Sequence, residues 1–158
     1  MNRLNGRCYM TWQRLFHELE VLEVKNIRFK SKDHEQFYYA MLEKSGNMDS
    51  YHQAFFYVMG IAEGTRANIE KMFDFKKDCI KPDGMRGGWQ TSGSVRVCYL
   101  AFNLWNVYTE KGRESDSTPY DLFACGYAPY FYEGIKLRYP EYCKEIPVIK
   151  LQDTEYVR

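Results

Sequence analysis

The segment that most constrains the fold is residues 94–108, SVRVCYLAFNLWNVY, because apolar side chains fall on nearly every side of a helix drawn through it. Val95, Cys98 and Trp105 mark one apolar face, and Val97 and Leu104 mark a second. A helix that is apolar on most sides lies in the centre of a fold, because its side chains need cover from several directions. The segment therefore predicts a central, buried helix with other elements packed around it.

Shorter helical segments with recognisable start and stop residues flank this one. One of these is a short helix that is capped by Thr65 and runs through Met72 to Phe73. The strict alternation typical of β-strands is absent. We therefore predict an all-α fold, a single compact helical domain of about five to seven helices with a long central loop. The residues that mark the ends of the other predicted helices are Ser31 and Gly46 for the first, Asp49 and Gly60 for the second, Thr118 with Pro119 for the start of a later one, and Pro129 and Pro140 for the start and stop of the last.

The two ends of the chain differ from its middle. Residues 1–30 are predicted to be an N-terminal amphipathic basic segment, in which Trp12, Phe16 and Leu19 recur at helical spacing. Its basic charge is typical of a solvated helix face, and nucleic-acid binding with Trp12 and Phe16 stacking on bases is the alternative. Residues 31–146 are predicted to form the helical domain, and residues 147–158 an extended C-terminal tail.

The overall charge gives no hint of a charged partner, since 22 Lys and Arg oppose 21 Asp and Glu. A balanced chain has no global attraction to nucleic acid or to an anionic membrane. No run approaches the roughly 18 consecutive apolar residues of a membrane span. The first residues, MNRLNGRCYMTW, lack the apolar core of a signal peptide, so we expect a cytoplasmic protein.

Residue types that carry chemistry are present but poorly spaced for it. The five cysteines contain no CxxC pair, and the three histidines contain no pair at i, i+4. There is no phosphate-binding loop and no nucleophile elbow around Ser92. We therefore expect no metal, no cofactor and no catalytic residue. An enzyme is the less favoured class, and the question stays open.

Residues 74–92 form the longest irregular stretch, and loops of this length in small domains are often functional. They lead into the start of the central helix, where free backbone N–H groups attract anions. In the functional interpretation, this segment binds an anion or nucleotide. In the structural one, Thr91, Ser92 or Ser94 caps the helix and Trp89 fills the core. The candidate binding residues are Arg86, Trp89, Gln90, Thr91, Ser92, Arg96 and Asn103.

Aromatic side chains are unusually abundant, with 14 Tyr, 10 Phe and 3 Trp. So many tyrosines either expose some of their rings or line a core whose hydroxyls reach its edges. Exposed Tyr and Trp are enriched in protein interfaces. This composition favours another protein as the partner and leaves the oligomeric state open.

Several runs of this sequence resemble one bacterial family. They are HEQFYYAMLEKSGNMDSYHQAFFYVMGI, WQTSGSVRVCYLAFNLWN, TPYDLF and APYFYEGIKLRYPEYC, which together span residues 34–143. The chain is similar to domain of unknown function 6075, found mainly in Firmicutes and their mobile elements. The resemblance implies one fold and a phage or mobile-element context, but no activity, cofactor or catalytic residue.

These observations favour a non-enzymatic protein-binding module. The mobile-element context suggests an inhibitor of a host defence or regulatory complex, which is an argument by association. The alternative is a small-ligand protein or enzyme that uses the segment from Trp89 to Arg96.

Overall fold

The computed structural model describes residues 26–144 and contains seven α-helices within that range. This confirms the predicted all-α class and the predicted number of helices. Two short strands, β1 (Phe73–Asp74) and β2 (Cys79–Ile80), pair antiparallel, and two 3-10 helices, η1 (Pro82–Arg86) and η2 (Glu114–Ser117), lie in the connections. The α-helices are α2 (Lys32–Ser45), α3 (Ser50–Met59), α4 (Glu63–Ala67), α5 (Ile69–Met72), α6 (Ser92–Asn106), α7 (Pro119–Phe123) and α8 (Ala128–Arg138).

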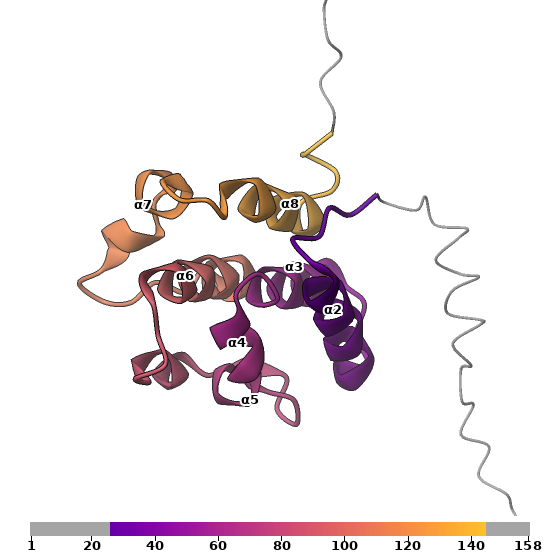
Figure 1. Cartoon of the computed structure of the whole chain (residues 1–158), viewed down its shortest axis with the longest axis horizontal. Helices are drawn as coiled ribbons and strands as arrows, with labels where there is room; N and C mark the ends of the chain where they lie inside the picture. Colours follow the sequence, from indigo (N-terminus) through magenta and orange to yellow (C-terminus); the bar gives the residue numbers. More distant parts are fainter. Residues whose placement is uncertain (1–25, 145–158) are drawn as a thin grey trace, which may run out of the picture.

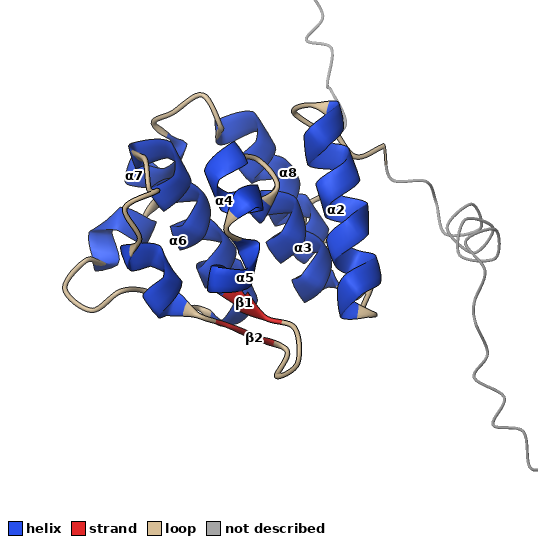
Figure 2. Ribbon diagram, turned by 60° about the horizontal axis from the view of Figure 1, so that its bottom comes forward, coloured by secondary structure: helices blue, strands red, loops and turns tan. Residues whose placement is uncertain are grey.

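Helices α3 and α6 form the centre of the fold. Helix α3 packs against α2, α6 and α8, so it contacts neighbours on three sides. In Figure 1, α7 and α8 lie above α6, whereas α4 and α5 lie below it. The β1–β2 hairpin projects from the end of α5, as Figure 2 shows. None of the helices within residues 26–144 is both long and apolar enough to cross a membrane.

The core confirms the predicted central helix. In α6, the side chains of Val97, Cys98 and Phe102 are fully buried, and Phe102 stacks on Phe55 of α3 with ring centres 6.2 Å apart. Burial raises the pKa of the Cys98 thiol to about 12, even though a hydrogen bond from Gln90 acts in the opposite direction. Cys98 is therefore an unreactive core thiol.

Most predicted helix ends are also confirmed. Ser31 caps α2 by accepting a hydrogen bond from the His34 N–H, and Gly46 ends it in the left-handed conformation at φ 70°. Asp49 caps α3, and Gly60 ends that helix. Helix α7 begins with a proline after Thr118, and α8 includes Pro129 in its first turn.

Two predictions about the middle of the chain were wrong. Thr65 does not cap a helix; it lies inside α4, where its hydroxyl donates to the carbonyls of Met59 and Ala62. The predicted helix through Phe73 is split into α4 and α5, and Phe73 itself begins β1. The expected loop at residues 74–92 contains the last residue of β1, the hairpin turn, β2, η1 and the first residue of α6.

Two glycines permit helices to approach closely. A Cβ added at Gly134 of α8 would lie 2.5 Å from Cγ2 of Val58 on α3. A Cβ at Gly60 would collide with the imidazole of His34 on α2. These contacts fix the spacing of α2 and α8 against α3, because packed interiors have little room to adjust.

The folded unit includes residues before Ser31. Phe29 packs its ring against His34, Tyr38 and Tyr57, and the Tyr57 hydroxyl donates to the Arg28 carbonyl. The predicted amphipathic helix around Trp12 and the predicted tail at residues 147–158 lie outside the described residues.

Candidate functional site

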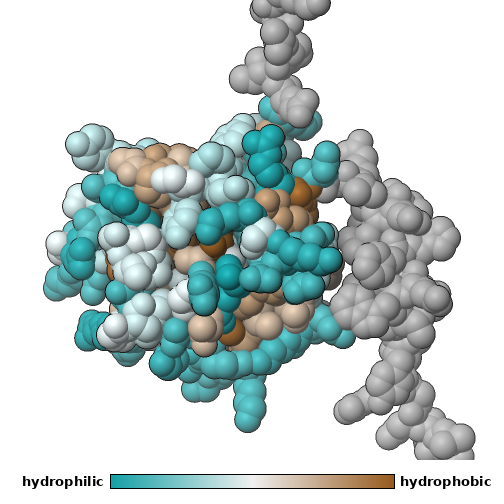
Figure 3. Space-filling view, in the orientation of Figure 1, coloured by the Kyte–Doolittle hydropathy of each residue, from teal (hydrophilic) through white to brown (hydrophobic). Residues whose placement is uncertain are grey.

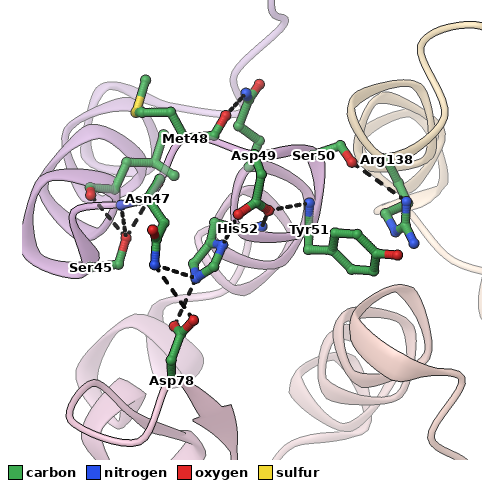
Figure 4. A network of polar contacts seen from close by, with 11 residues as sticks. Ser45, Asn47, Met48, Asp49, Ser50, Tyr51, His52, Asp78 and Arg138 are labelled. Carbon is green, nitrogen blue, oxygen red and sulfur yellow. Dashed lines mark hydrogen bonds and ion pairs between the residues drawn. The ribbon is translucent and has the colours of Figure 1, made fainter.

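A network of polar contacts surrounds the N-terminus of α3 (Figure 4). His52 lies at its centre and is only 4% exposed. Nδ1 of His52 lies 2.8 Å from the Asp49 carboxylate, and Nε2 lies 2.8 Å from the carboxylate of Asp78 in the β1–β2 turn. The Asn47 amide lies beside them, 3.5 Å from Asp78. The network thus connects α3 to the hairpin.

Both ring nitrogens of His52 face carboxylates, which decides what this side chain can do. A general base or a metal ligand needs a free nitrogen lone pair. Here Asp49 and Asp78 occupy both nitrogens, and the ring edge of Trp105 lies against the imidazole at 4.8 Å between centres. His52 therefore links α3 to the β1–β2 turn and has no free ring nitrogen for catalysis.

Asp49 is held in its ionised form by this arrangement. Partial burial alone would raise the pKa of its carboxyl group. Hydrogen bonds from the backbone and imidazole of His52 and from the Tyr51 N–H outweigh that effect, so the pKa lies below its ordinary value. A carboxylate at a helix N-terminus also interacts favourably with the helix dipole.

Asp78 adopts a backbone conformation that few residues tolerate. Its φ is +54°, in the left-handed region, where Asp is more acceptable than most non-glycine residues. This conformation turns the Asp78 carboxylate toward His52.

Two exposed tyrosines contact Arg138, in the last turn of α8. Its guanidinium lies 3.5 Å from the centre of the Tyr51 ring and 4.8 Å from that of Tyr139. Arg138 Nε donates to the Leu104 carbonyl in the last turn of α6 at 2.9 Å. Tyr142, three residues after Tyr139, is 81% exposed.

The residue that follows α6 is also unusual. Val107 has a φ of +63° and is 80% exposed. A β-branched residue in the left-handed region is strained, and glycine or asparagine is the common choice there. We define the Arg138 surface as Arg138 and the two tyrosines whose rings contact it, Tyr51 and Tyr139, together with two exposed residues that follow the ends of α6 and α8. These are Val107, directly after the α6 turn to which Arg138 bonds, and Tyr142, whose N–H donates to the Tyr139 carbonyl.

The tyrosines divide between the two arrangements that the sequence left open. Tyr38, Tyr57 and Tyr99 are buried in the core. Six others are exposed and account for all but one of the exposed large hydrophobic side chains within residues 26–144. They are Tyr39, Tyr51, Tyr120, Tyr132, Tyr139 and Tyr142.

Much of the predicted Trp89–Arg96 site has internal structural contacts. Thr91 and Ser94 form a reciprocal capping box at the start of α6. Gln90 accepts a hydrogen bond from the Ser94 hydroxyl at 2.6 Å and lies 3.7 Å from the sulfur of Cys98. The Trp89 ring packs on Gly64, where an added Cβ would lie 3.3 Å from it. These contacts match the structural interpretation of this segment.

The other candidate binding residues take no part in these contacts. Arg86 and Ser92 are exposed, and Arg96 and Asn103 are half-buried. Ser92, Arg96 and Asn103 share one side of α6, because positions i, i+4 and i+11 fall on one helix face. Within the described range, the Arg96 and Asn103 side chains form no hydrogen bond or ion pair. Binding by this segment stays a prediction.

Sequence reasoning did not select the members of the Arg138 surface. Two local signals were available: a basic residue in the last turn of α8, and two tyrosines around the helix-stopping Pro140. Neither signal indicates that Tyr51, on α3, meets Arg138.

One family matches most of the chain. Its description is a family of unknown function (DUF6075), and the match covers residues 24–150. No curated protein and no solved structure matches the chain. Within residues 26–144, no three His, Cys, Asp or Glu side chains gather in a way that could hold a metal ion.

Proposed function

Since this chain belongs to the DUF6075 family, whose function is unknown, we propose a function from its geometry: it is a protein-binding module that engages its partner through the Arg138 surface. The observation that carries this proposal is the stacking of Arg138 on Tyr51 at 3.5 Å, with the exposed ring of Tyr139 lying 4.8 Å from the same guanidinium. Exposed Tyr142 follows in the same turn, where its N–H donates to the Tyr139 carbonyl. Tyrosine and arginine are the residue types that dominate interface hot spots.

The exposure of these side chains supports the same function. Tyrosine offers a large contact area with few rotatable bonds, so ordering it on binding costs little entropy. On the face shown in Figure 3, hydrophilic and pale residues are mixed and the hydrophobic areas are small. Recognition would therefore depend on individual amphipathic side chains rather than on a broad apolar patch.

The mobile-element context implied by the family resemblance suggests the kind of partner. We propose a defence or regulatory complex of a bacterial host, which the module would block by occupying its surface. This part of the proposal rests on association.

An affinity capture from a lysate of the native host tests the proposal. The wild-type chain is compared with the Tyr139→Ala/Tyr142→Ala variant and with Tyr120→Ala as the matched control, because Tyr120 is 85% exposed on α7. We expect a protein that is retained by wild type and by the control but lost by the double variant. Equal retention by all three chains would exclude the Arg138 surface.

A second function is supported by the unpaired polar stripe on α6. Arg96 and Asn103 share a helix face with Ser92 and form no side-chain hydrogen bonds within the described part of the chain. A small anion bound there would use the guanidinium of Arg96. Thermal unfolding with inorganic phosphate and nucleotides tests this idea, since a ligand at 100 times its Kd stabilises by about 2.7 kcal/mol. An unchanged melting temperature in wild type would remove this function.

A further inference from the structure

We propose that Arg138 is the receptor for a carboxylate side chain, Asp or Glu, of the partner protein. This inference rests on the proposed protein-binding function and specifies the chemistry of the partner.

The guanidinium is held in one place before any partner arrives. Its Nε donates to the Leu104 carbonyl at 2.9 Å, and one Nη lies 3.5 Å from the Ser50 hydroxyl. The rings of Tyr51 and Tyr139 lie 3.5 and 4.8 Å from it. A cation fixed from several sides loses little side-chain entropy when it binds, which favours affinity.

The charge of Arg138 is not balanced by a carboxylate in the described part of the chain. Some cations there form close ion pairs, such as Arg113 with Asp116 at 2.6 Å and Lys136, on the same helix as Arg138, with Glu133 at 2.8 Å. Others in the same part of the chain, such as Arg96, form none, and Arg138 differs from them in being held by neighbours on several sides. Within residues 26–144, the negative charge that Arg138 contacts is the partial charge of the α6 C-terminus, through the Leu104 carbonyl. A half-buried cation without a counter-ion is stabilised by a carboxylate that reaches it from outside.

The surroundings suit a carboxylate. One Nη of Arg138 has no hydrogen-bond partner within residues 26–144, and an arginine edge presents N–H groups that match the two oxygens of a carboxylate. The hydroxyls of Tyr51 and Tyr139, whose rings contact the guanidinium, likewise make no hydrogen bond there and can donate to a bound acid.

Charge complementarity also argues against a second copy of this chain as the occupant. A two-fold interface centred on this surface would bring the same patch of both copies together. Two unbalanced Arg138 guanidinium groups would then face one another, and like charges across an interface are unfavourable.

The test titrates the full-length, 15N-labelled chain with a pair of peptides. The probes are acetyl-Ala-Glu-Leu-Ala-amide, its Gln counterpart, and inorganic phosphate. The readout is the Arg138 Nε–Hε signal, assigned by its absence in the Arg138→Lys variant. We expect the Glu peptide to bind about 5-fold more tightly than the Gln peptide, because hydrogen bonds to charged groups are the stronger ones.

The variants separate the carboxylate preference from a structural effect. Arg138→Lys should remove the preference. Tyr139→Ala removes a ring 4.8 Å from the guanidinium but leaves the hydrogen bonds of Arg138 intact, and it should weaken Glu-peptide binding by about 3-fold. The second variant keeps the test valid if the first does not fold. Equal shifts with both peptides, tighter binding of phosphate, or self-association that depends on Arg138 would each overturn the inference.

This outcome is distinguishable from failure of the proposed function. A partner captured through Tyr139 and Tyr142 by a chain that shows no Glu preference supports protein binding and refutes the carboxylate receptor. A chain that prefers the Glu peptide but captures the same proteins as the Tyr139→Ala/Tyr142→Ala variant refutes the proposed function.

Discussion

Nε2 of His52 donates a hydrogen bond to the carboxylate of Asp78 at 2.8 Å, and this contact joins the centre of the fold to the β1–β2 turn. The donor belongs to a buried ring on α3, whereas the acceptor lies in a two-stranded hairpin whose strands are only two residues long. Such a short hairpin has little stability of its own, so its position depends on contacts of this kind.

The substitution Asp78→Asn measures the value of that contact. Asparagine tolerates the left-handed backbone of this position but carries no charge. We expect the free energy of unfolding at pH 7 to fall by about 1 kcal/mol. Urea unfolding measures the change, and Asp83→Asn on η1 is the control because Asp83 is exposed and forms no ion pair in the described part of the chain.

A double-mutant cycle tests whether His52 is the group on which the Asp78 carboxylate acts. In the His52→Gln background, Asp78→Asn should change stability by less than about 0.5 kcal/mol, because the interaction is already lost. An equal effect in both backgrounds would show that the carboxylate of Asp78 acts on another group.

His34 predicts a pH dependence of stability. Burial first, then the positive charges of Arg66 and Lys30, lower the pKa of His34 from 6.5 to about 4, although a hydrogen bond to the Tyr57 carbonyl opposes them. Below pH 6.5 the unfolded chain binds a proton at this residue and the folded chain does not. Stability is therefore fully present above pH 6.5 and decreases as the pH falls toward 4, by up to about 3 kcal/mol.

Urea unfolding at pH values between 7 and 4.5 measures this loss. His34→Gln keeps a donor for the Tyr57 carbonyl but cannot titrate, so its stability should depend less on pH in this window. Parallel curves for the wild type and the variant would contradict the assignment to His34. Asp49, whose pKa is also lowered, contributes a loss only at more acidic pH.

The close approach of α3 and α8 predicts that Gly134 cannot be enlarged. Gly134→Ala places a methyl group 2.5 Å from Cγ2 of Val58, and overpacking of this kind typically destabilises by about 1–3 kcal/mol. Gly126→Ala is the matched control, because nothing lies within 4 Å of its added Cβ. Thermal unfolding of both variants checks the prediction, and a Gly134→Ala chain as stable as the control would contradict it.

The helix ends could be predicted because they depend on neighbours in the sequence. A cap such as Ser31 or Asp49 bonds to an N–H two or three residues ahead, and a stop such as Gly46 needs only its own backbone freedom. Thr65 was mistaken for a cap because a threonine hydroxyl can equally well donate to a carbonyl three residues back. The hairpin was missed because two-residue strands are too short to show an alternating pattern.

The candidate site could not be predicted in the same way. Ser50 and Arg138 lie 88 residues apart, and only the packing of α8 on α3 brings Tyr51 under the guanidinium. The abundance of tyrosine indicated that some rings would be exposed, but which ones depends on tertiary contacts. The segment around Trp89 was predicted as a binding site from its glycines and polar residues, but two of those polar residues, Thr91 and Ser94, cap the start of α6.

The strained backbone of Val107 leads to a prediction that separates stability from binding. Asparagine accepts a positive φ more readily than valine, so Val107→Asn should raise the free energy of unfolding by about 1 kcal/mol. Val107→Ala keeps much of the backbone penalty and should bring no such gain.

Both variants remove the exposed isopropyl group of Val107, so both should retain less of the partner in the capture experiment. Thermal unfolding and capture are measured on the same preparations. A Val107→Asn chain no more stable than Val107→Ala would contradict the strain, and full capture by both would remove Val107 from the binding surface.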